Sequence, residues 1–316
     1  MNPKYPSPYK HAAFAQQYHP EFLLKLFALA DKIRANPRDF KNALEGKVVA
    51  LLFYRESTRT RFSFCTAILR LGGQFIETEN AEMFSSATKG ESLAHTIRVV
   101  SGYADAIVLR HENEDAPKEA LRATLVPFIN AGCGSGQHLT QALTDAYTVY
   151  QHFGTLENLD IALVGDLARG RTCRSLAYVF SLFPSNRFFF VSPPELGMRD
   201  DIKEHLRERG CAFSEYTDVE DILVRANVLY MTRVQKERPL PGNAGTVLEN
   251  PYHVSLEDAR RMPPNAIIMH PLPIDGEIAT EVDTEPNAHY FRQSDNGMWI
   301  RMALLYTLLG GPLKNA

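Results

Sequence analysis

The chain has 316 residues, of which 45% are hydrophobic and 22% charged, and its formal net charge is −3. This composition is typical of a globular protein with an ample core, and the length predicts two domains. Without an overall basic field, we expect neither nucleic acid nor a membrane surface as a partner. No apolar run in the sequence approaches the ~20 residues that are needed to cross a bilayer.

The N-terminal stretch is rich in proline and polar residues and lacks the apolar segment of a secretory signal. The four cysteines are widely spaced and form neither a C-x-x-C pair nor a Cys/His cluster: Cys65, Cys133, Cys173 and Cys211. This pattern predicts reduced thiols in a cytoplasmic protein and argues against structural zinc.

Apolar runs typical of strands alternate with helical patterns along most of the chain. We expect strands at residues 48–54, 74–77, 106–109, 126–129, 160–164, 187–191, 227–231 and 266–269. We expect helices at 58–71, 91–104, 141–152, 172–180, 199–209 and 256–261. Continuous apolar strands separated by helices predict an α/β fold with parallel sheets that helices cover on both faces.

Polar side chains follow six of the expected strands. These segments are Ser57–Arg61, Arg110-His111, Asn130–His138, Gly165–Arg171, Thr232–Gln235 and His270–Pro273. Ligands of parallel α/β folds bind beyond the carboxyl ends of the strands, so these segments are the candidate site.

Between the first expected strand and the first expected helix lies the run Ser57-Thr58-Arg59-Thr60-Arg61. Ser57 suits the N-cap position, and the first backbone N–H groups of a helix favour anions. Three hydroxyls and two guanidinium groups within five residues match the hydrogen-bonding needs of phosphate oxygens. The run therefore predicts a phosphate site.

Seven motifs, read in chain order, resemble those of the aspartate and ornithine carbamoyltransferases. They are ESTRTRFSF (56–64), SSATKGES (85–92), VLRH (108–111), NAGCGSGQHLTQALTD (130–145), VGDLARGRT (164–172), LYMTRVQKER (229–238) and HPLP (270–273). The TRVQKER and HPLP forms are similar to the aspartate branch. The SMG and HCLP motifs of the ornithine branch are absent from the sequence.

The resemblance implies two α/β domains with the active site in the cleft between them. The carbamoyl phosphate domain would comprise residues 1–140 with a C-terminal helix at 296–316, and the amino-acid domain residues 141–295. Members of this family transfer the carbamoyl group of carbamoyl phosphate to an amine without a metal or an organic cofactor. For the aspartate branch the amine is that of L-aspartate, in pyrimidine biosynthesis.

The resemblance also implies the roles of individual residues. Carbamoyl phosphate would be bound by Ser57, Thr58, Arg59, Thr60, Ser85, Lys89, Arg110, His138, Gln141, Leu272 and Pro273. Of these, the residues with a catalytic role would be Arg59, Thr60, Arg110, His138 and Gln141. The two carboxylates of aspartate would be bound by Arg171 and Arg233, with Gln235 as a polar companion.

In this family the loop that contains Ser85 and Lys89 reaches into the active site of the neighbouring subunit. The resemblance therefore implies a homotrimer with shared active sites. A regulatory chain or a partner enzyme would also be compatible with the sequence. His270 is expected only to support the site, and Cys133 and Cys173 to be spectators.

Four positions depart from the usual pattern of the aspartate branch: Arg55, Cys133, Leu139 and Ile274. Arg55 stands where a glutamate commonly precedes the phosphate motif, and Ile274 where an arginine completes PLPR. Both positions belong to the amino-acid side of the site in the family. They leave open a transcarbamoylase that acts on a different amine.

Two further alternatives come from other classes of protein. The run Gly132–Gly136 could open a dinucleotide-binding loop of an oxidoreductase, but Gln137 replaces the third glycine of the fingerprint and Asp166 follows too late. A non-catalytic paralogue kept for assembly is the other alternative. Such a protein would be expected to lose phosphate-site residues, and this chain retains Arg59 and Arg110.

Overall fold

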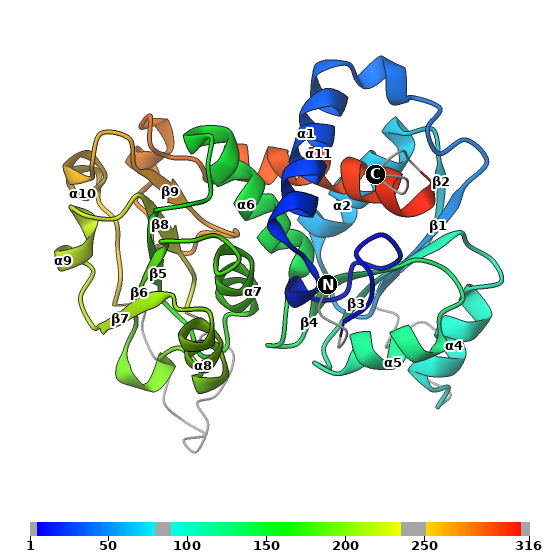
Figure 1. Cartoon of the computed structure of the whole chain (residues 1–316), viewed down its shortest axis with the longest axis horizontal. Coiled ribbons are helices and arrows are strands. Elements are labelled where there is room, and N and C mark those ends of the chain that lie inside the picture. The colour runs from blue at the N-terminus through cyan, green and yellow to red at the C-terminus, as the bar shows by residue number, and fades with distance from the viewer. Residues whose placement is uncertain (1–4, 80–89, 235–250, 311–316) are drawn as a thin grey trace. The chain divides into compact units, whose positions relative to one another are not determined.

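The computed structural model describes residues 5–79, 90–234 and 251–310. The chain divides into two compact units, the first formed by residues 1–147 with 295–316 and the second by residues 148–294. Each unit contains one parallel sheet with helices packed on it (Figure 1). This arrangement confirms the α/β class and the parallel sheets predicted from the sequence.

The sheet of the first unit has four strands in the order β2-β1-β3-β4. Their bounds are β1 Val48–Phe53, β2 Gln74–Glu79, β3 Ala106–His111 and β4 Phe128–Cys133. The helices of this unit are α1 Pro20–Ala35, α2 Thr58–Arg70, α4 Leu93–Val100 and α5 Ala116–Ala123. The unit also contains most of α6 Leu139–Phe153 and most of α11 Tyr290–Leu309, whose remaining residues belong to the second unit. Short 3-10 helices lie at Ala15–Gln17 and Pro37–Phe40.

Side chains of the first sheet alternate between two apolar layers. Ala50 and Leu52 of β1 pack with Ile97 of α4 and Ala120 of α5, all of them buried. Their neighbours along the strand point to the opposite face because the side-chain period of a strand is two. On that face lies α2, which in Figure 1 is separated from α4 and α5 by the strands. Since both faces are covered, the central strand β1 is apolar throughout.

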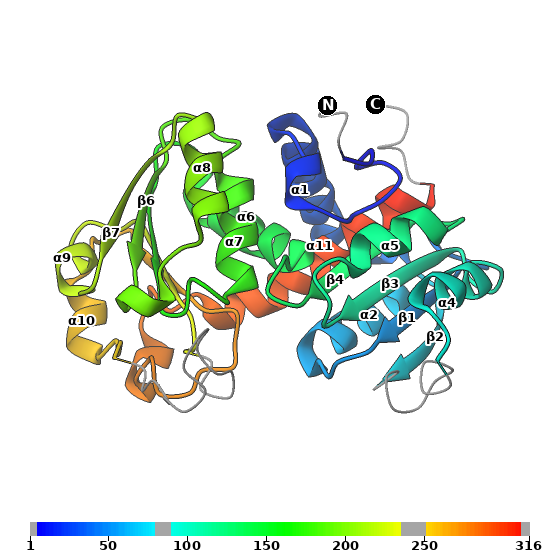
Figure 2. The same ribbon diagram turned by 90° about the horizontal axis from the view of Figure 1, so that it is seen from below.

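The sheet of the second unit has five strands in the order β7-β6-β5-β8-β9. Figure 2 shows the edge strand β7 beside β6. Their bounds are β5 Asp160–Val164, β6 Arg187–Val191, β7 Ala212–Tyr216, β8 Val228–Met231 and β9 Ile267–Met269. The helices of this unit are α7 Arg171–Phe180, α8 Asp200–Glu208, α9 Glu220–Leu223 and α10 Leu256–Arg261. Short 3-10 helices lie at Pro194–Leu196 and Thr280–Thr284.

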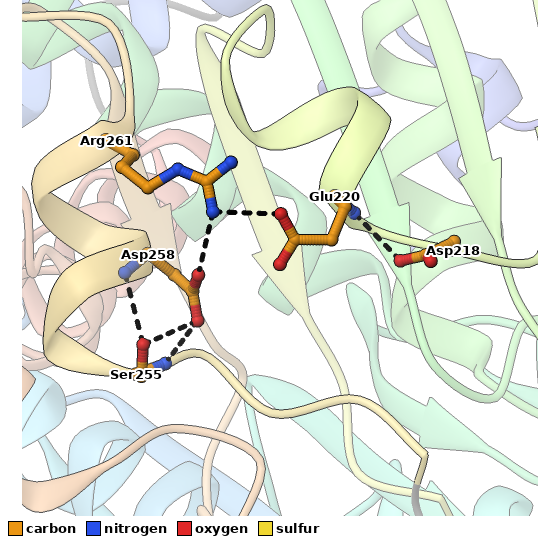
Figure 3. Close-up of polar contacts among 5 residues, drawn as sticks. All are labelled: Asp218, Glu220, Ser255, Asp258 and Arg261. Carbon is orange, nitrogen blue, oxygen red and sulfur yellow. Dashed lines mark hydrogen bonds and ion pairs between the residues drawn. The ribbon is translucent and has the colours of Figure 1, made fainter.

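Helix α10 is fixed at both ends by side chains, as Figure 3 shows. Ser255 is its N-cap and exchanges hydrogen bonds with Asp258, forming a capping box. At the other end, Arg261 lies 2.9 Å from the Glu220 carboxylate of α9 and 3.6 Å from that of Asp258. The two short helices thereby cover one face of the sheet as a single layer, over a core that includes Leu229 of β8.

Most of the predicted elements are confirmed, and the differences have physical reasons. β4 begins at residue 128 and continues to 133, because the polar residues that follow the apolar run still pair with β3. β7 was missed because it is a half-exposed edge strand in which polar residues interrupt the apolar ones. α1 and α5 were missed, and each has a proline in its first turn, where proline is tolerated although it otherwise indicates a loop.

Gly165, directly after β5, permits a close approach of two strand ends. Its φ is +116°, and a Cβ atom there would lie 2.3 Å from the carbonyl oxygen of Thr232, the residue after β8. We expect Gly165→Ala to destabilise the protein by roughly 2–4 kcal/mol, through the steric clash and the left-handed backbone. Urea unfolding of the full chain measures this effect.

The matched control for this prediction is Gly210→Ala. Gly210 also has a positive φ, +68°, but a Cβ there meets nothing within 4 Å. It should cost only the roughly 1–2 kcal/mol of the backbone conformation. Equal losses for the two variants would show that the close approach to Thr232 is unimportant.

Candidate functional site

Sheet topology places three polar segments side by side in the first unit. Ser57–Thr60 follows β1, Arg110 is the last residue but one of β3, and His138–Gln141 follows β4. β1, β3 and β4 are consecutive neighbours in the sheet, so their carboxyl ends share one edge. The Tyr54 N–H donates to the carbonyl oxygen of Arg110 at 2.9 Å and joins two of the segments directly.

The start of α2 has the features of an anion site. Ser57 is at the N-cap, as predicted, but its side chain forms no capping hydrogen bond. The first-turn N–H groups of Thr58, Arg59 and Thr60 have no acceptor within the helix. They are therefore available to an anion, which the positive end of the helix dipole also favours. Thr60 is buried, whereas the neighbouring Arg59 is exposed.

The two arginines of this run have different surroundings. Arg61 is paired with both Glu77 and Glu79 of β2, with its Nε 3.3 Å from the Glu77 carboxylate. This pairing ties α2 to β2 and assigns Arg61 a structural role. Arg59 is exposed, and among the residues that the structure describes it has neither a hydrogen bond nor an ion pair. Arg59 is therefore the better candidate for holding a ligand.

Arg110 and His138 approach the same edge from the neighbouring strands. Arg110 is half-buried, and its guanidinium lies 3.4 Å from the carbonyl oxygen of Ala131 in β4. His138 is 5% exposed and precedes α6, where its carbonyl oxygen accepts from the N–H groups of Gln141 and Ala142. The side chains predicted to polarise a carbamoyl oxygen thus come from adjacent strand ends of one unit.

The amide of Gln141 is oriented by a buried acid. Its Nε2 donates to Oδ1 of Asp145 at 2.8 Å, and Asp145 is fully buried. Because the NH2 of Gln141 is directed at a carboxylate, its carbonyl oxygen is left to accept from a ligand. An acceptor is what the predicted contact with a carbamoyl NH2 group requires.

Arg301 of α11 supplies the positive charge beside Asp145. Its side chain is buried and lies over the ring of Phe64, with 5.2 Å from Cζ to the ring centroid. Burial lowers the pKa of Arg301 to about 10, and the negative charge of Asp145 acts in the opposite direction. Neither residue could be predicted from the sequence, since a lone Asp and a lone Arg on helices carry no signal of this kind.

The glycine-rich run after β4 has a structural role in this protein. Gly134 packs against the Glu112 carbonyl oxygen, which would be 2.3 Å from an added Cβ. Gln137 is buried, accepts from the Ala15 N–H at 2.8 Å and donates to Gln16. Glycines and amide are thus occupied in packing the loop, which disfavours a dinucleotide-binding role. Cys133 is buried and reduced, as expected of a spectator.

The N-terminal segment extends the same sheet beyond β4. Ala12 forms a parallel bridge with Ile129, donates to the Phe128 carbonyl oxygen and accepts from the Asn130 N–H. The side-chain amide of Asn130 also donates to the carbonyl oxygen of Ala13 at 3.0 Å. The free edge of β4 is therefore covered by the chain's own N-terminal residues.

Arg55, the first of the four departures, has its charge balanced locally. Its Nε lies 3.0 Å from the Glu112 carboxylate, and its terminal nitrogen is also paired with that group. Glu112 directly follows β3, so the pair lies between two of the three strand ends that carry the site. Glu112 was not predicted from the sequence as a partner of Arg55. Because of this pair, the positive charge at position 55 need not raise the net charge of the site.

The second unit also groups its predicted residues on neighbouring strands. Arg171 begins α7 after β5, Arg233 follows β8, and Leu272 and Pro273 follow β9. β5, β8 and β9 are consecutive in the sheet, so these segments share its carboxyl edge. Both arginines are half-exposed, which suits them to a dicarboxylate. Arg169 beside them is paired with Asp166 at 2.7 Å and is structural.

Three predicted residues, Ser85, Lys89 and Gln235, lie outside the described residues. Residues 5–79, 90–234 and 251–310 contain no group of three or more His, Cys, Asp or Glu side chains that could hold a metal ion. Of the described residues predicted to bind carbamoyl phosphate, Leu272 and Pro273 lie in the second unit and the others in the first. That the residues of the two units meet at one site stays a prediction.

Comparison with known proteins matches each of the two units to a family model. The model described as "Aspartate/ornithine carbamoyltransferase, carbamoyl-P binding domain" matches residues 10–151, and "Aspartate/ornithine carbamoyltransferase, Asp/Orn binding domain" matches residues 157–308. The chain belongs to the aspartate/ornithine carbamoyltransferase family. The resemblance inferred from the seven motifs is thereby confirmed.

Individual members of the family are similar over nearly the whole chain. A chloroplastic aspartate carbamoyltransferase of Oryza sativa is 46% identical over 94% of this chain and 84% of the relative. The aspartate carbamoyltransferase catalytic subunit of Clostridium novyi is 45% identical over 92% of this chain and 94% of the relative. Aspartate transcarbamoylase of Trypanosoma cruzi, crystallised with carbamoyl phosphate and aspartate, is 35% identical over 95% and 97% of the two chains, with a TM-score of 0.90.

The role of Asp145 in the first unit can be tested by unfolding. We expect Asp145→Asn to destabilise the protein by roughly 2–4 kcal/mol, because the buried guanidinium of Arg301 then loses the negative charge beside it. Urea unfolding provides the measurement. The double variant Asp145→Asn with Arg301→Met should lose at least about 1 kcal/mol less than the sum of the single changes. Additive losses would exclude an interaction between the two side chains.

Proposed function

We propose that this chain transfers the carbamoyl group of carbamoyl phosphate to the amine of L-aspartate. The products are N-carbamoyl-L-aspartate and phosphate, and the reaction belongs to pyrimidine biosynthesis. The observation that carries the proposal is the grouping of Arg59, Arg110, His138 and Gln141 at the ends of three adjacent strands. The names of the relatives, at 44–46% identity, favour aspartate over other amines.

The chemistry needs orientation and charge stabilisation rather than a protein nucleophile. The lone pair of the amine forms the new N–C bond, and the C–O bond to phosphate breaks with its electron pair. The amine nitrogen gives up one proton, which the departing phosphate can accept. Arg59 and the start of α2 stabilise the charge on the phosphate, and Arg110 and His138 that on the carbamoyl oxygen.

Aspartate is bound through its two carboxylates by Arg171 and Arg233 in this proposal. Each guanidinium can bind a carboxylate through two parallel hydrogen bonds, which a lysine cannot do. Both arginines follow neighbouring strands of the second unit and are half-exposed. Gln235, next but one to Arg233, would complete this side of the site.

A different amine acceptor is the second candidate function, and it depends on the four departures. Ile274 packs against the apolar core of the second unit, so this position offers no charge to a substrate. Leu139 is fully buried, and Arg55 is paired with Glu112. Three departures are thus absorbed by packing or by a local ion pair, and this favours aspartate. A non-catalytic paralogue is disfavoured by the retained phosphate-site residues.

We further infer a homotrimer with shared active sites, in which Ser85 and Lys89 act on the neighbouring subunit. In support, α2 presents the large apolar side chains of Phe62 and Leu69 to solvent, 57% and 59% exposed. They are seven residues apart and therefore lie on one face of the helix. Exposed apolar faces of this kind mark protein interfaces. Regulatory chains or a partner enzyme are compatible with this assembly.

A reducing compartment such as the cytoplasm is the proposed location. All four cysteines are free thiols. Within the described part of the chain, no helix is long and apolar enough to cross a membrane.

The decisive experiment measures product formation from carbamoyl phosphate with a panel of amines. The panel comprises aspartate, ornithine, 2,3-diaminopropionate, acetyl-ornithine and succinyl-ornithine. We expect turnover with aspartate alone. Preferred turnover of another amine would favour the second candidate, and no turnover with any amine would leave the non-catalytic paralogue.

Two arginine variants serve as a matched pair in the same assay. Arg110→Ala should lower kcat/KM at least about 100-fold, because a donor to the reacting group is lost. Arg122→Ala, at an exposed position on α5, should leave the rate unchanged. A near-normal rate for Arg110→Ala would contradict the proposal that this site binds carbamoyl phosphate.

Shared active sites can be tested by mixing two inactive variants. Lys89→Ala and Arg59→Ala subunits, dissociated together and reassembled in equal amounts, should recover about one quarter of the normal activity. This fraction follows because each site needs one intact copy of each residue from two different chains. Unmixed variants are the control. If no activity returns although mixed oligomers form, the shared-site assembly is wrong.

A further inference from the structure

Two ionisable side chains are buried together where β9 ends. His270 is 1% exposed and Glu277 is fully buried. The Nε2 atom of His270 lies 2.7 Å from Oε1 of Glu277. Burying such groups is unfavourable unless each is hydrogen-bonded. The burial of two ionisable groups next to Leu272 and Pro273 in the chain therefore needs a physical explanation.

Hydrogen bonding fixes the proton on the imidazole. The Nδ1 atom of His270 lies 2.7 Å from the backbone nitrogen of Leu272, whose N–H can only donate. Nδ1 must therefore accept, and the proton of the neutral ring is on Nε2, the nitrogen beside Glu277. Burial raises the pKa of Glu277, but the bonds from His270 and the Asp275 N–H more than offset this and hold it below its usual value.

His270 and Glu277 stand at the two ends of the turn at residues 270–277, and both form hydrogen bonds with its backbone. The second carboxylate oxygen of Glu277 accepts from the Asp275 N–H at 2.9 Å. The backbone N–H of His270 donates to Oε1 of Gln293, also at 2.9 Å. Within this frame Leu272 has a φ of +58°, a left-handed conformation that residues with a side chain rarely adopt. The hydrogen bond from its N–H to His270 holds Leu272 in that conformation.

The two carbonyl oxygens that follow are directed elsewhere. Among the residues that the structure describes, no hydrogen bond reaches the carbonyl oxygens of Leu272 or Pro273. Leu272 is partly exposed and Pro273 exposed. The N–H groups of His270, Leu272 and Asp275 are thus satisfied within the protein, while two carbonyl acceptors remain for a ligand.

We propose that His270 and Glu277 are a positioning pair that fixes the Leu272 backbone, so that the carbonyl oxygens of Leu272 and Pro273 can accept from the carbamoyl NH2 group. This inference rests on the proposed function. It makes the pair a determinant of selectivity for a carbamoyl group over an acyl group of the same shape. A CH3 group in place of the NH2 group could not donate to these oxygens.

The test compares the affinities of carbamoyl phosphate and acetyl phosphate, which differ in NH2 against CH3. Dissociation constants come from calorimetric titration of the whole protein. His270→Gln keeps a donor for Glu277 but loses the acceptor for the Leu272 N–H. His270→Asn can place its Oδ1 atom where Nδ1 accepts from the Leu272 N–H, but its shorter side chain no longer reaches Glu277 with a donor. We expect the preference for carbamoyl phosphate to fall about tenfold in His270→Gln and to stay within about twofold of normal in His270→Asn.

Glu277→Gln gives a second route to the same result. Its single amide oxygen cannot accept from both His270 and the Asp275 N–H. The amide NH2 then favours the other imidazole tautomer, which cannot accept from Leu272. The preference of Glu277→Gln for carbamoyl phosphate over acetyl phosphate should therefore also fall. If His270→Asn alone does not fold, its combination with Glu277→Gln removes the buried charge and retains the acceptor, and this double variant should keep the preference.

Inorganic phosphate separates positioning from general loss of structure. It binds without an NH2 group, so its dissociation constant should be unchanged in every folded variant. An unchanged preference in His270→Gln, or equal losses in His270→Gln and His270→Asn, would overturn the positioning role. Failure of the unaltered protein to bind carbamoyl phosphate would instead refute the proposed function.

Discussion

Parallel pairing of neighbouring strands is the constraint on which the rest of the structure depends. In each unit three consecutive neighbours, β1-β3-β4 and β5-β8-β9, end at the same edge of the sheet. Segments far apart in the chain, such as Ser57–Thr60 and His138–Gln141, reach one place only because of this pairing. Apolar strands buried on both faces supply the stability, and the polar residues can then be selected for chemistry.

Side chains beneath the site decide what its surface groups can do. Asp145 turns the Gln141 amide so that its oxygen is free to accept, and Arg301 balances the charge of that acid. His270 and Glu277 act in the same way on a turn of the second unit, through a backbone N–H rather than a side chain. In both places a buried acid fixes an acceptor that can meet an amide-like NH2 group.

Much of this could be predicted from the sequence, and the reasons are visible in particular residues. β5 and β6 were located because their apolar runs are continuous, and the phosphate run because hydroxyls and arginines crowd into five positions. Partners such as Glu112, Asp145 and Glu277 could not be predicted. Glu112 and Asp145 interact with arginines that are distant in the chain, and the contact of Glu277 with His270 is formed across a turn. The edge strand β7 was missed because half-exposed strands tolerate polar residues.

The N-terminal segment has a consequence for how the sheet of the first unit is protected. An exposed strand edge is a template for pairing with another chain, and Ala12 occupies that edge along β4. The segment also holds the loop after β4 through Ala15 and Gln137. Proteolytic trimming or an affinity tag that disturbed these few residues would therefore promote aggregation and loosen the loop that leads to His138, although none of them is a predicted site residue.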